Sequence, residues 1–142
     1  MQINVMLVDG TPLPRHAKPG DAGMDLTARR SVTLMPQEVA IVGTGVRAEI
    51  PDGYVGLVFP RSGMASGRGI TLANAVGVVD SGYRGEIMAP LLNVAGAPRH
   101  VEAGERVCQL VVVPFATCEC VEVESLSETE RGEGGFGSTG ND

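Results

Sequence analysis

The sequence predicts an all-β domain, a sandwich or barrel with at most one short helix, on three observations. Its 142 residues include 20 glycines and 9 prolines, too many for a helical bundle and typical of short strands joined by turns. Turn signals recur every several residues, and the stretches between them show no sustained helical period. Hydrophobic residues make up 43% of the chain but aromatic residues only 4%, so aliphatic side chains must fill the core of a single domain.

Six short strands are predicted in the first 60 residues, each bounded by a turn signal. They span residues 2–8, 21–28, 32–34, 38–42, 46–50 and 54–59. A proline-rich loop at 10–20 separates the first two, and Pro51-Asp52-Gly53 is a strong turn signal before the sixth. Residues 60–69 are small and polar, which predicts one short helix capped by Ser62.

The second half is centred on residues 74–86, NAVGVVDSGYRGE, which are predicted to form a β-hairpin. A β-branched run at 75–79 enters a turn with Asp80 at its tip, Gly82 at positive φ, and Tyr83 beyond it. An acid and an aromatic ring at a hairpin tip would form a rigid slot for a small flat ligand. The alternative is an ordinary turn, because aspartate favours turns through its side-chain hydrogen bonds.

Four further strands complete the prediction. One at 70–72 leads into the hairpin, one at 86–93 returns from it, a short one lies at 100–101, and a long run spans 106–116. The apolar part of this run, 107–113, alternates poorly, which suits a strand buried on both faces or one that packs against another subunit.

The charge and hydropathy of the chain exclude some classes of function. The chain carries 11 basic and 17 acidic residues, a net charge of −6, which argues against a bulk nucleic-acid binder with a basic face. A polyanion would have to be bound locally, by placed arginines, backbone amides or a metal. The N-terminus lacks the features of a signal peptide, and no stretch has the length of a membrane span. We therefore expect a cytoplasmic protein with no nucleic-acid and no membrane partner.

Cysteine usage points to the same compartment. Cys108, Cys118 and Cys120 are odd in number and lack the Cys-x-x-Cys spacing of metal sites. On a strand, Cys118 and Cys120 would share one face. All three are interpreted as small buried hydrophobic residues in a reducing cytosol.

The composition changes near residue 121, which divides the chain into a β domain at 1–121 and a C-terminal arm at 122–142. The arm is acidic and ends RGEGGFGSTGND, with Phe136 between two glycines. Glycine-rich ends are usually flexible linkers. Exposed amides and hydroxyls, one arginine and one ring also suit a flexible lid that holds phosphate oxygens and stacks on a base.

Three stretches have the chemistry of phosphate binding: Arg61-Ser62-Gly63, Gln109, and Arg131 with the glycines of 134–140. Arginine offers forked donors to phosphate oxygens, and glycines let backbone N–H groups approach an anion closely. Each stretch is weak evidence alone. Arg-Ser-Gly also suits a helix cap, and Gln109 also suits a residue that pairs with a neighbouring strand.

Two carboxylates stand apart in the sequence, Asp25 in the predicted strand at 21–28 and Asp80 at a predicted turn. Either is a surface acid or a group that faces a hard cation. Mg²⁺ prefers such oxygen ligands and often keeps its waters.

Five motifs lie in order along nearly the whole chain. They are AGMDLTA at 22–28, PRSGMA at 60–65, NAVGVVDSGYRGE at 74–86, GERVCQL at 104–110 and RGEGGFGSTG at 131–140. Together they resemble the five motifs of the trimeric deoxyuridine triphosphate nucleotidohydrolase (dUTPase) family, and five in register are specific where one would be weak. The resemblance implies a jelly-roll-like β-barrel or sandwich with a glycine-rich flexible tail.

The resemblance also implies residue roles. Asp80 would be the catalytic residue that activates the water attacking the α-phosphorus, and Asp25 would hold Mg²⁺ through water. Tyr83 would pack under the sugar and leave no room for a 2′-hydroxyl, while Asn74 and nearby backbone would read uracil. The full set of implied substrate-binding residues is Arg61, Ser62, Gly63, Asn74, Val79, Tyr83, Gln109, Arg131, Phe136, Gly137, Ser138 and Thr139.

The implied function is the hydrolysis of dUTP to dUMP and pyrophosphate, with Mg²⁺ as cofactor and active sites shared within a homotrimer. Such an activity keeps uracil out of DNA and supplies dUMP for thymidylate synthesis. Three positions depart from the family pattern: Met64 replaces a usual leucine, Gly67 a frequent lysine and Gly82 a common acid. None of them removes a reacting group.

Three alternatives stay open. A dCTP deaminase shares the broader superfamily fold but needs a catalytic glutamate and different phosphate motifs. A nucleotide-gated regulator would usually carry an inserted segment, and no insert is evident between the motifs. A purely structural β domain would make all five motif matches coincidental.

Overall fold

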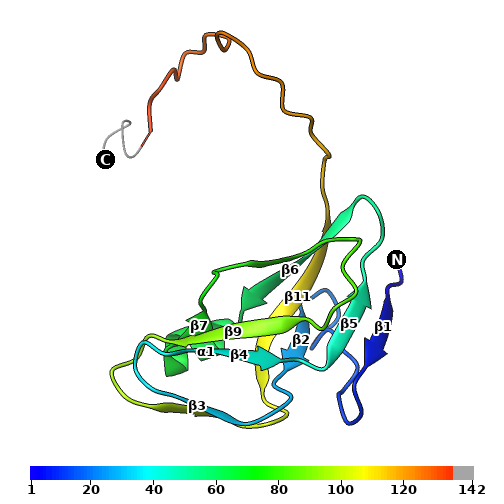
Figure 1. Cartoon of the computed structure of the whole chain (residues 1–142), viewed down its shortest axis with the longest axis vertical. Coiled ribbons are helices and arrows are strands. Elements are labelled where there is room, and N and C mark those ends of the chain that lie inside the picture. Colours follow the sequence, from blue (N-terminus) through cyan, green and yellow to red (C-terminus); the bar gives the residue numbers. More distant parts are fainter. Residues whose placement is uncertain (136–142) are drawn as a thin grey trace.

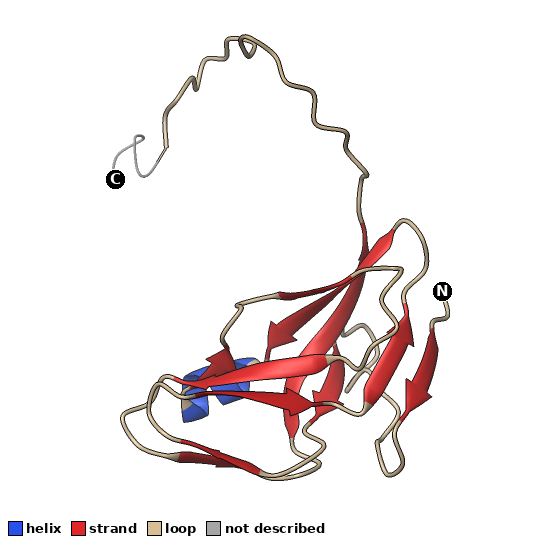
Figure 2. Cartoon of the chain, viewed as in Figure 1, coloured by secondary structure: helices blue, strands red, loops and turns tan. Residues whose placement is uncertain are grey.

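Residues 1–135, the part of the chain that the computed structural model describes, contain four small antiparallel sheets and one short helix (Figure 1). The elements are β1 (Asn4–Leu7), β2 (Met24–Thr27), β3 (Val32–Leu34), β4 (Val39–Gly43), β5 (Val46–Glu49), β6 (Tyr54–Pro60), α1 (Ser62–Arg68), β7 (Ile70–Leu72), β8 (Gly77–Val79), β9 (Met88–Asn93), β10 (Arg99–Val101) and β11 (Arg106–Pro114). Strands dominate the described residues, and the sheets do not close into a barrel (Figure 2). The predicted all-β, jelly-roll-like class is confirmed.

The two larger sheets share one aliphatic core. Strands β2, β11, β6 and β8 form the first, and β4, β9 and β7 form the second. In β9, buried and more exposed residues alternate, as expected for a strand with one face on the core. Buried leucines such as Leu26, Leu91 and Leu110 belong to the same cluster as the buried valines Val42 and Val58. Aliphatic packing thus replaces the aromatic residues that the composition lacks.

The long strand β11 brings several predicted site residues together. It pairs with β2 on one side and β6 on the other, so that Gln109 lies opposite both Asp25 and Phe59. A register shift between Arg106 and Cys108 interrupts the pairing with β2. The first half of the strand is largely buried and its last residues are half-buried or exposed, so the expectation of burial on both faces fails beyond Leu110.

The helix forms where small residues predicted it, but Ser62 does not cap it. Arg61 occupies the N-cap position without a side-chain cap hydrogen bond, and Ser62 is the first helical residue. Gly69 ends the helix in the left-handed region, at φ 66°, which a side chain would rarely adopt. Arg68 in the last turn pairs with Glu105, which ties the helix to the turn before β11.

The prediction of a β-hairpin at 74–86 is wrong, because the two strands that flank the turn do not pair with each other. Strand β8 pairs with β6, whereas β9 pairs with β4 and β7 in the other sheet, so residues 80–87 cross between sheets. Ala75 has φ 60° and lies in a turn rather than in the strand, while Gly82 lies outside the positive-φ region. The turn itself is present, because the Tyr83 N–H donates to the Asp80 carbonyl at 3.1 Å.

The three cysteines divide into two kinds. Cys108 is fully buried, as expected, but Cys118 and Cys120 are exposed on a segment without helix or strand. Strand β11 ends at Pro114, so no ladder extends to Cys118 or Cys120. Burial, reinforced by the nearby Asp25 charge, raises the pKa of Cys108 from 9.0 to about 12.

We expect iodoacetamide at pH 8 to leave Cys108 unmodified in the native protein, because the thiolate is the nucleophile. The raised pKa contributes stability below pH 9, and this contribution is lost as the pH rises toward about 12. Peptide mass spectrometry with and without urea provides the measurement. Native labelling of Cys108 as fast as in urea would contradict its burial.

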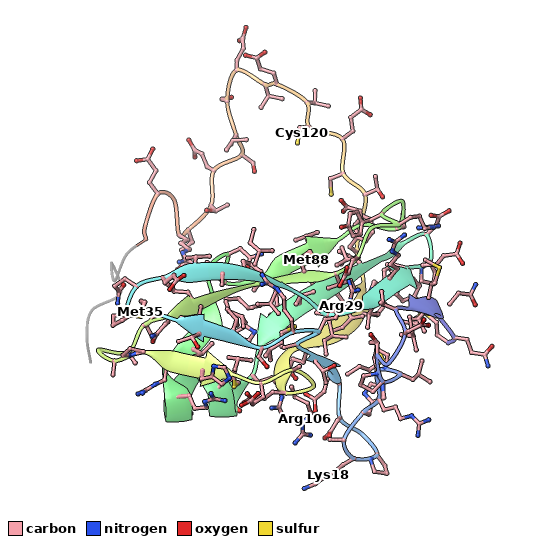
Figure 3. All side chains as sticks on the ribbon, turned by 60° about the horizontal axis from the view of Figure 1, so that its bottom comes forward. Lys18, Arg29, Met35, Met88, Arg106 and Cys120 are labelled. Atoms are coloured by element: carbon pink, nitrogen blue, oxygen red, sulfur yellow. The ribbon has the colours of Figure 1, made fainter. Side chains whose placement is uncertain are left out.

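Beyond β11 the chain leaves the sheets. Residues 115–135 carry no helix or strand, and Figure 1 shows them arching away from the body. In Figure 3, Cys120 lies on this arch and Arg106 lies on the opposite side of the molecule. Among the described residues, no helix is long and apolar enough to cross a membrane.

Candidate active site

A hollow of about 500 Å³ lies where β2, β11 and the start of α1 meet. Its size is typical of pockets for small ligands. The pairing of β2 with β11 brings residues more than eighty positions apart in sequence to one wall, and the end of β6 delivers the next residues to it. The predicted site residues that line it are Asp25, Arg61, Ser62, Gly63 and Gln109.

Two arginines hold the carboxylate of Asp25 in this hollow. The Arg61 Nε donates to Oδ1 at 2.7 Å, and the Arg106 Nη1 donates to Oδ2 at 3.0 Å. The Asp25 side chain is only 18% exposed. Arg61 also donates from Nη1 to the Arg106 carbonyl at 3.3 Å. The cluster therefore carries one excess positive charge in a fixed orientation, which suits an anionic ligand.

Arg106 received no role from the sequence, although it lies within the motif GERVCQL. Its position three residues before Gln109 on the same predicted strand could have indicated that Arg106 belongs to the site. Its partner Asp25 lies 81 residues away, and the register shift beside Arg106 alters their alignment. No local pattern predicts such a pair.

The Gln109 side chain lies close to the backbone of Gly23, the residue that precedes β2. A Cβ atom at Gly23 would lie 2.3 Å from the Gln109 Oε1, so this approach requires glycine. The Gln109 Nε2 donates to the Pro60 carbonyl at 3.1 Å, which fixes the amide beside the Arg61 loop. The amides of Ser62 and Gly63 open the helix, where N–H groups lack intrahelical partners and suit phosphate oxygens.

A second group of predicted residues lies elsewhere. Asn74, Val79, Asp80 and Tyr83 do not line this hollow, because β8 is separated from β2 by β6 and β11. Val79 buries its side chain in the core, so a ligand could contact only its backbone. Asn74 is exposed in the tight turn before β8. The predicted site is thus divided into two separate groups within one chain.

The Asp80 turn presents its acid and its ring to the outside. Asp80 is exposed, and its carboxylate makes no hydrogen bond or ion pair with any residue in 1–135. Tyr83 is 44% exposed and donates its hydroxyl to the Glu86 carbonyl at 2.9 Å. A Cβ atom at Gly85 would lie 2.3 Å from the Tyr83 hydroxyl oxygen, so glycine lets the ring fold back against the chain.

The arm residues are only partly described. Arg131 is exposed, and within residues 1–135 its guanidinium hydrogen-bonds only to the Gly134 carbonyl, at 3.1 Å. The predicted residues Phe136, Gly137, Ser138 and Thr139 lie outside the described part of the chain. Within residues 1–135, neither group of site residues therefore includes a residue of the arm.

The side chains near Asp25 offer few ligands to a metal ion. In the described part of the chain, no three His, Cys, Asp or Glu side chains are placed to hold an ion. Asp25 already accepts from two arginines, and of the other acids only Asp21 lines the same hollow. This set fits a hard cation that brings most of its ligands with it, as Mg²⁺ does when bound to phosphates and water.

A strand-built hollow with arginines and helix-opening amides is the kind of site with which a β domain can bind a phosphorylated small molecule. A dUTPase family model matches residues 9–140, and the chain belongs to the dUTPase family. The family predicted from the five motifs is therefore confirmed. Membership also makes the chain an enzyme of the nucleotidohydrolase class.

Similar proteins agree with this assignment. A deoxyuridine 5′-triphosphate nucleotidohydrolase from Cutibacterium acnes is 55% identical over 129 residues, which cover 90% of this chain and 85% of that protein. One from Thermobifida fusca is 52% identical, with coverage of 91% and 73%. The solved dUTPase of Staphylococcus bacteriophage 80alpha with dUpNHpp is 32% identical, with a TM-score of 0.92 and 99% coverage of both chains.

Proposed function

We propose that this chain hydrolyses dUTP to dUMP and pyrophosphate in the cytoplasm, keeping uracil out of DNA and supplying dUMP for thymidylate synthesis. The observation that carries the proposal is the meeting of Asp25, Arg61 and Gln109 around one hollow in a member of the dUTPase family. In this proposal the hollow receives the triphosphate. Arg61, Gln109 and the amides of Ser62 and Gly63 bind its oxygens.

In the proposed mechanism, Asp80 is the general base that orients a water in line with the α-phosphorus. Its support is an exposed carboxylate with no partner in residues 1–135, at a turn next to Tyr83. Tyr83 packs under the deoxyribose and excludes a 2′-hydroxyl. Asn74 and the Val79 backbone read the edge of uracil.

dUTPases depend on a divalent cation, and we propose Mg²⁺ for this chain. Asp25 would hold this ion through water, and the ion would neutralise charge on the phosphates when bound. The role of the protein here is to hold the Asp25 carboxylate in a fixed orientation between Arg61 and Arg106. The paired arginines also limit Asp25 to an outer contact.

The active site is proposed to be shared within a homotrimer. Two observations support sharing. The residues that line the hollow and the residues of the Asp80 turn lie apart in one chain, and the arm exposes apolar side chains such as Val123 (57%) and Leu126 (86%). Apolar residues without partners in their own domain suit burial against another subunit. The arm, divided from the domain at residue 121, would place Arg131, Phe136, Gly137, Ser138 and Thr139 over a neighbouring site.

A pyrophosphate-release assay over dUTP, dTTP, dCTP and UTP tests the function. We expect turnover of dUTP alone and its loss when EDTA removes the divalent cation. Equal release from dTTP would overturn the proposed specificity, and ammonia from dCTP would identify a deaminase. A stable monomer with full activity would contradict the shared site.

A further inference from the structure

The loop between β8 and β9 carries two proposed site residues but has no strand partner. Residues 80–86 lie between strands of different sheets, so no ladder of backbone hydrogen bonds holds them. Their conformation must come from local turns and side chains. The loop must be placed accurately, because a shift of about 1 Å in a positioned catalytic group can lower the rate about a hundredfold.

Arg84 provides the most extensive of these contacts. Its Nη1 donates to the Ser81 carbonyl at 2.6 Å and to the Tyr83 carbonyl at 3.0 Å. Its Nη2 donates to the Glu49 Oε1 at 3.1 Å. One guanidinium therefore joins both sides of the turn to strand β5.

Glu49 is itself held on a paired strand. It lies opposite Asn4 in the β1–β5 pairing, and the Asn4 Nδ2 donates to its Oε2 at 2.7 Å. The hydrogen bond from Asn4, followed by the charge of Arg84, lowers the pKa of Glu49, so the carboxylate stays charged at neutral pH. The turn is thereby connected through Arg84 and Glu49 to regular structure.

We propose that Arg84 is a positioning residue that fixes the Asp80–Tyr83 turn on the β1–β5 sheet and thereby sets the discrimination between deoxyribose and ribose. The inference rests on the proposed function, in which Tyr83 leaves no room for a 2′-hydroxyl. Tyr83 then has two anchors: its hydroxyl on Glu86 and its carbonyl on Arg84. Loss of the second lets the ring move and admits the larger sugar.

The arginine fork is essential to this role. A lysine ammonium is a single point donor on a flexible stem and cannot reproduce the planar contacts to two carbonyls and a carboxylate. The side chains of Arg84 and Glu49 are about half exposed, so their ion pair contributes little to global stability. Removal of Arg84 should therefore disturb the turn without unfolding the domain.

The test compares kcat/KM for dUTP and UTP in Arg84→Ala, Arg84→Lys and a matched control, Arg47→Ala. Arg47 lies on β5 and lines a surface hollow together with Glu49 and Arg84, but it makes no side-chain hydrogen bond or ion pair within residues 1–135. We expect the dUTP-to-UTP ratio to fall about tenfold in Arg84→Ala and less in Arg84→Lys, and to change less than about twofold in Arg47→Ala.

An Arg84→Ala enzyme whose dUTP-to-UTP ratio matches that of Arg47→Ala would overturn the inference. An equal loss of kcat/KM on both substrates is one form of this result, and it would indicate a merely structural arginine. If Arg84→Ala does not fold, Glu49→Gln replaces it, since it removes the charged partner and keeps the arginine. An unchanged ratio in Glu49→Gln would then count against the proposal.

Failure of the proposed function is distinguishable from failure of this inference. A wild-type protein that does not hydrolyse dUTP overturns the function alone. Hydrogen exchange of the amides in 81–86 then decides the role of Arg84. Faster exchange in Arg84→Ala than in Arg47→Ala supports the positioning role, and identical exchange overturns it.

Discussion

Replacing Asp80 with asparagine is expected to lower kcat for dUTP by about 10²- to 10⁴-fold, the usual contribution of a positioned general base. Asparagine has nearly the same shape but cannot accept a proton from the attacking water. Asp80 is exposed and makes no side-chain hydrogen bond or ion pair within residues 1–135, so its charge is not needed for packing. The free energy of unfolding and the affinity for dUTP should therefore change little.

Single-turnover kinetics and calorimetric binding of a non-hydrolysable dUTP analogue separate these effects. Asp9→Asn is a matched control, because Asp9 is an exposed acid in another turn and its side chain makes no hydrogen bond within the described residues. This control should retain wild-type kcat. Full activity in Asp80→Asn would remove Asp80 from the catalytic role.

Deleting residues 131–142 is expected to keep the proposed trimer and to slow turnover by about 10²-fold or more. The deletion removes a proposed lid and an arginine that would neutralise charge on the γ-phosphate, and arginines in that role contribute about 10³- to 10⁵-fold elsewhere. The described part of the removed segment, 131–135, adds no strand to the sheets, and within residues 1–135 Arg131 hydrogen-bonds only inside its own turn. The β domain should therefore fold as before.

Light scattering after size exclusion measures the assembly, and steady-state kinetics measure kcat. Full-length Arg131→Ala separates the arginine from the rest of the arm and should retain part of the activity. Normal hydrolysis of dUTP by the truncated protein would eliminate the lid. Dissociation into monomers would instead show that the removed segment holds the assembly together.

Local signals predicted much of the fold. Strand positions agree with the structure to within a few residues, as for Val32–Leu34 and Ile70–Leu72, because turn residues and apolar runs act over short distances. The errors occurred where tertiary contacts decide. Strand β8 pairs with β6 instead of its neighbour in sequence, and Ser62 enters the helix instead of capping it.

The candidate site shows the same division. Asp25, Arg61 and Gln109 were selected from motifs and do line one hollow. Arg84 and Arg106 received no role, although each contacts a predicted site residue in the structure. The sequence around an arginine does not identify the residue with which it pairs. Only the folded chain therefore distinguishes these two arginines from the other surface arginines.

By itself, the sequence determined the all-β class, the order of the five motifs and the family, since these depend on residue types at short spacing. Only the tertiary structure decided which strands pair, that two arginines share Asp25, and that Arg84 connects the Asp80–Tyr83 turn to β5. The physical reason is distance along the chain. The Arg106–Asp25 contact joins residues 81 apart and the Arg84–Glu49 contact residues 35 apart, and strand register sets both.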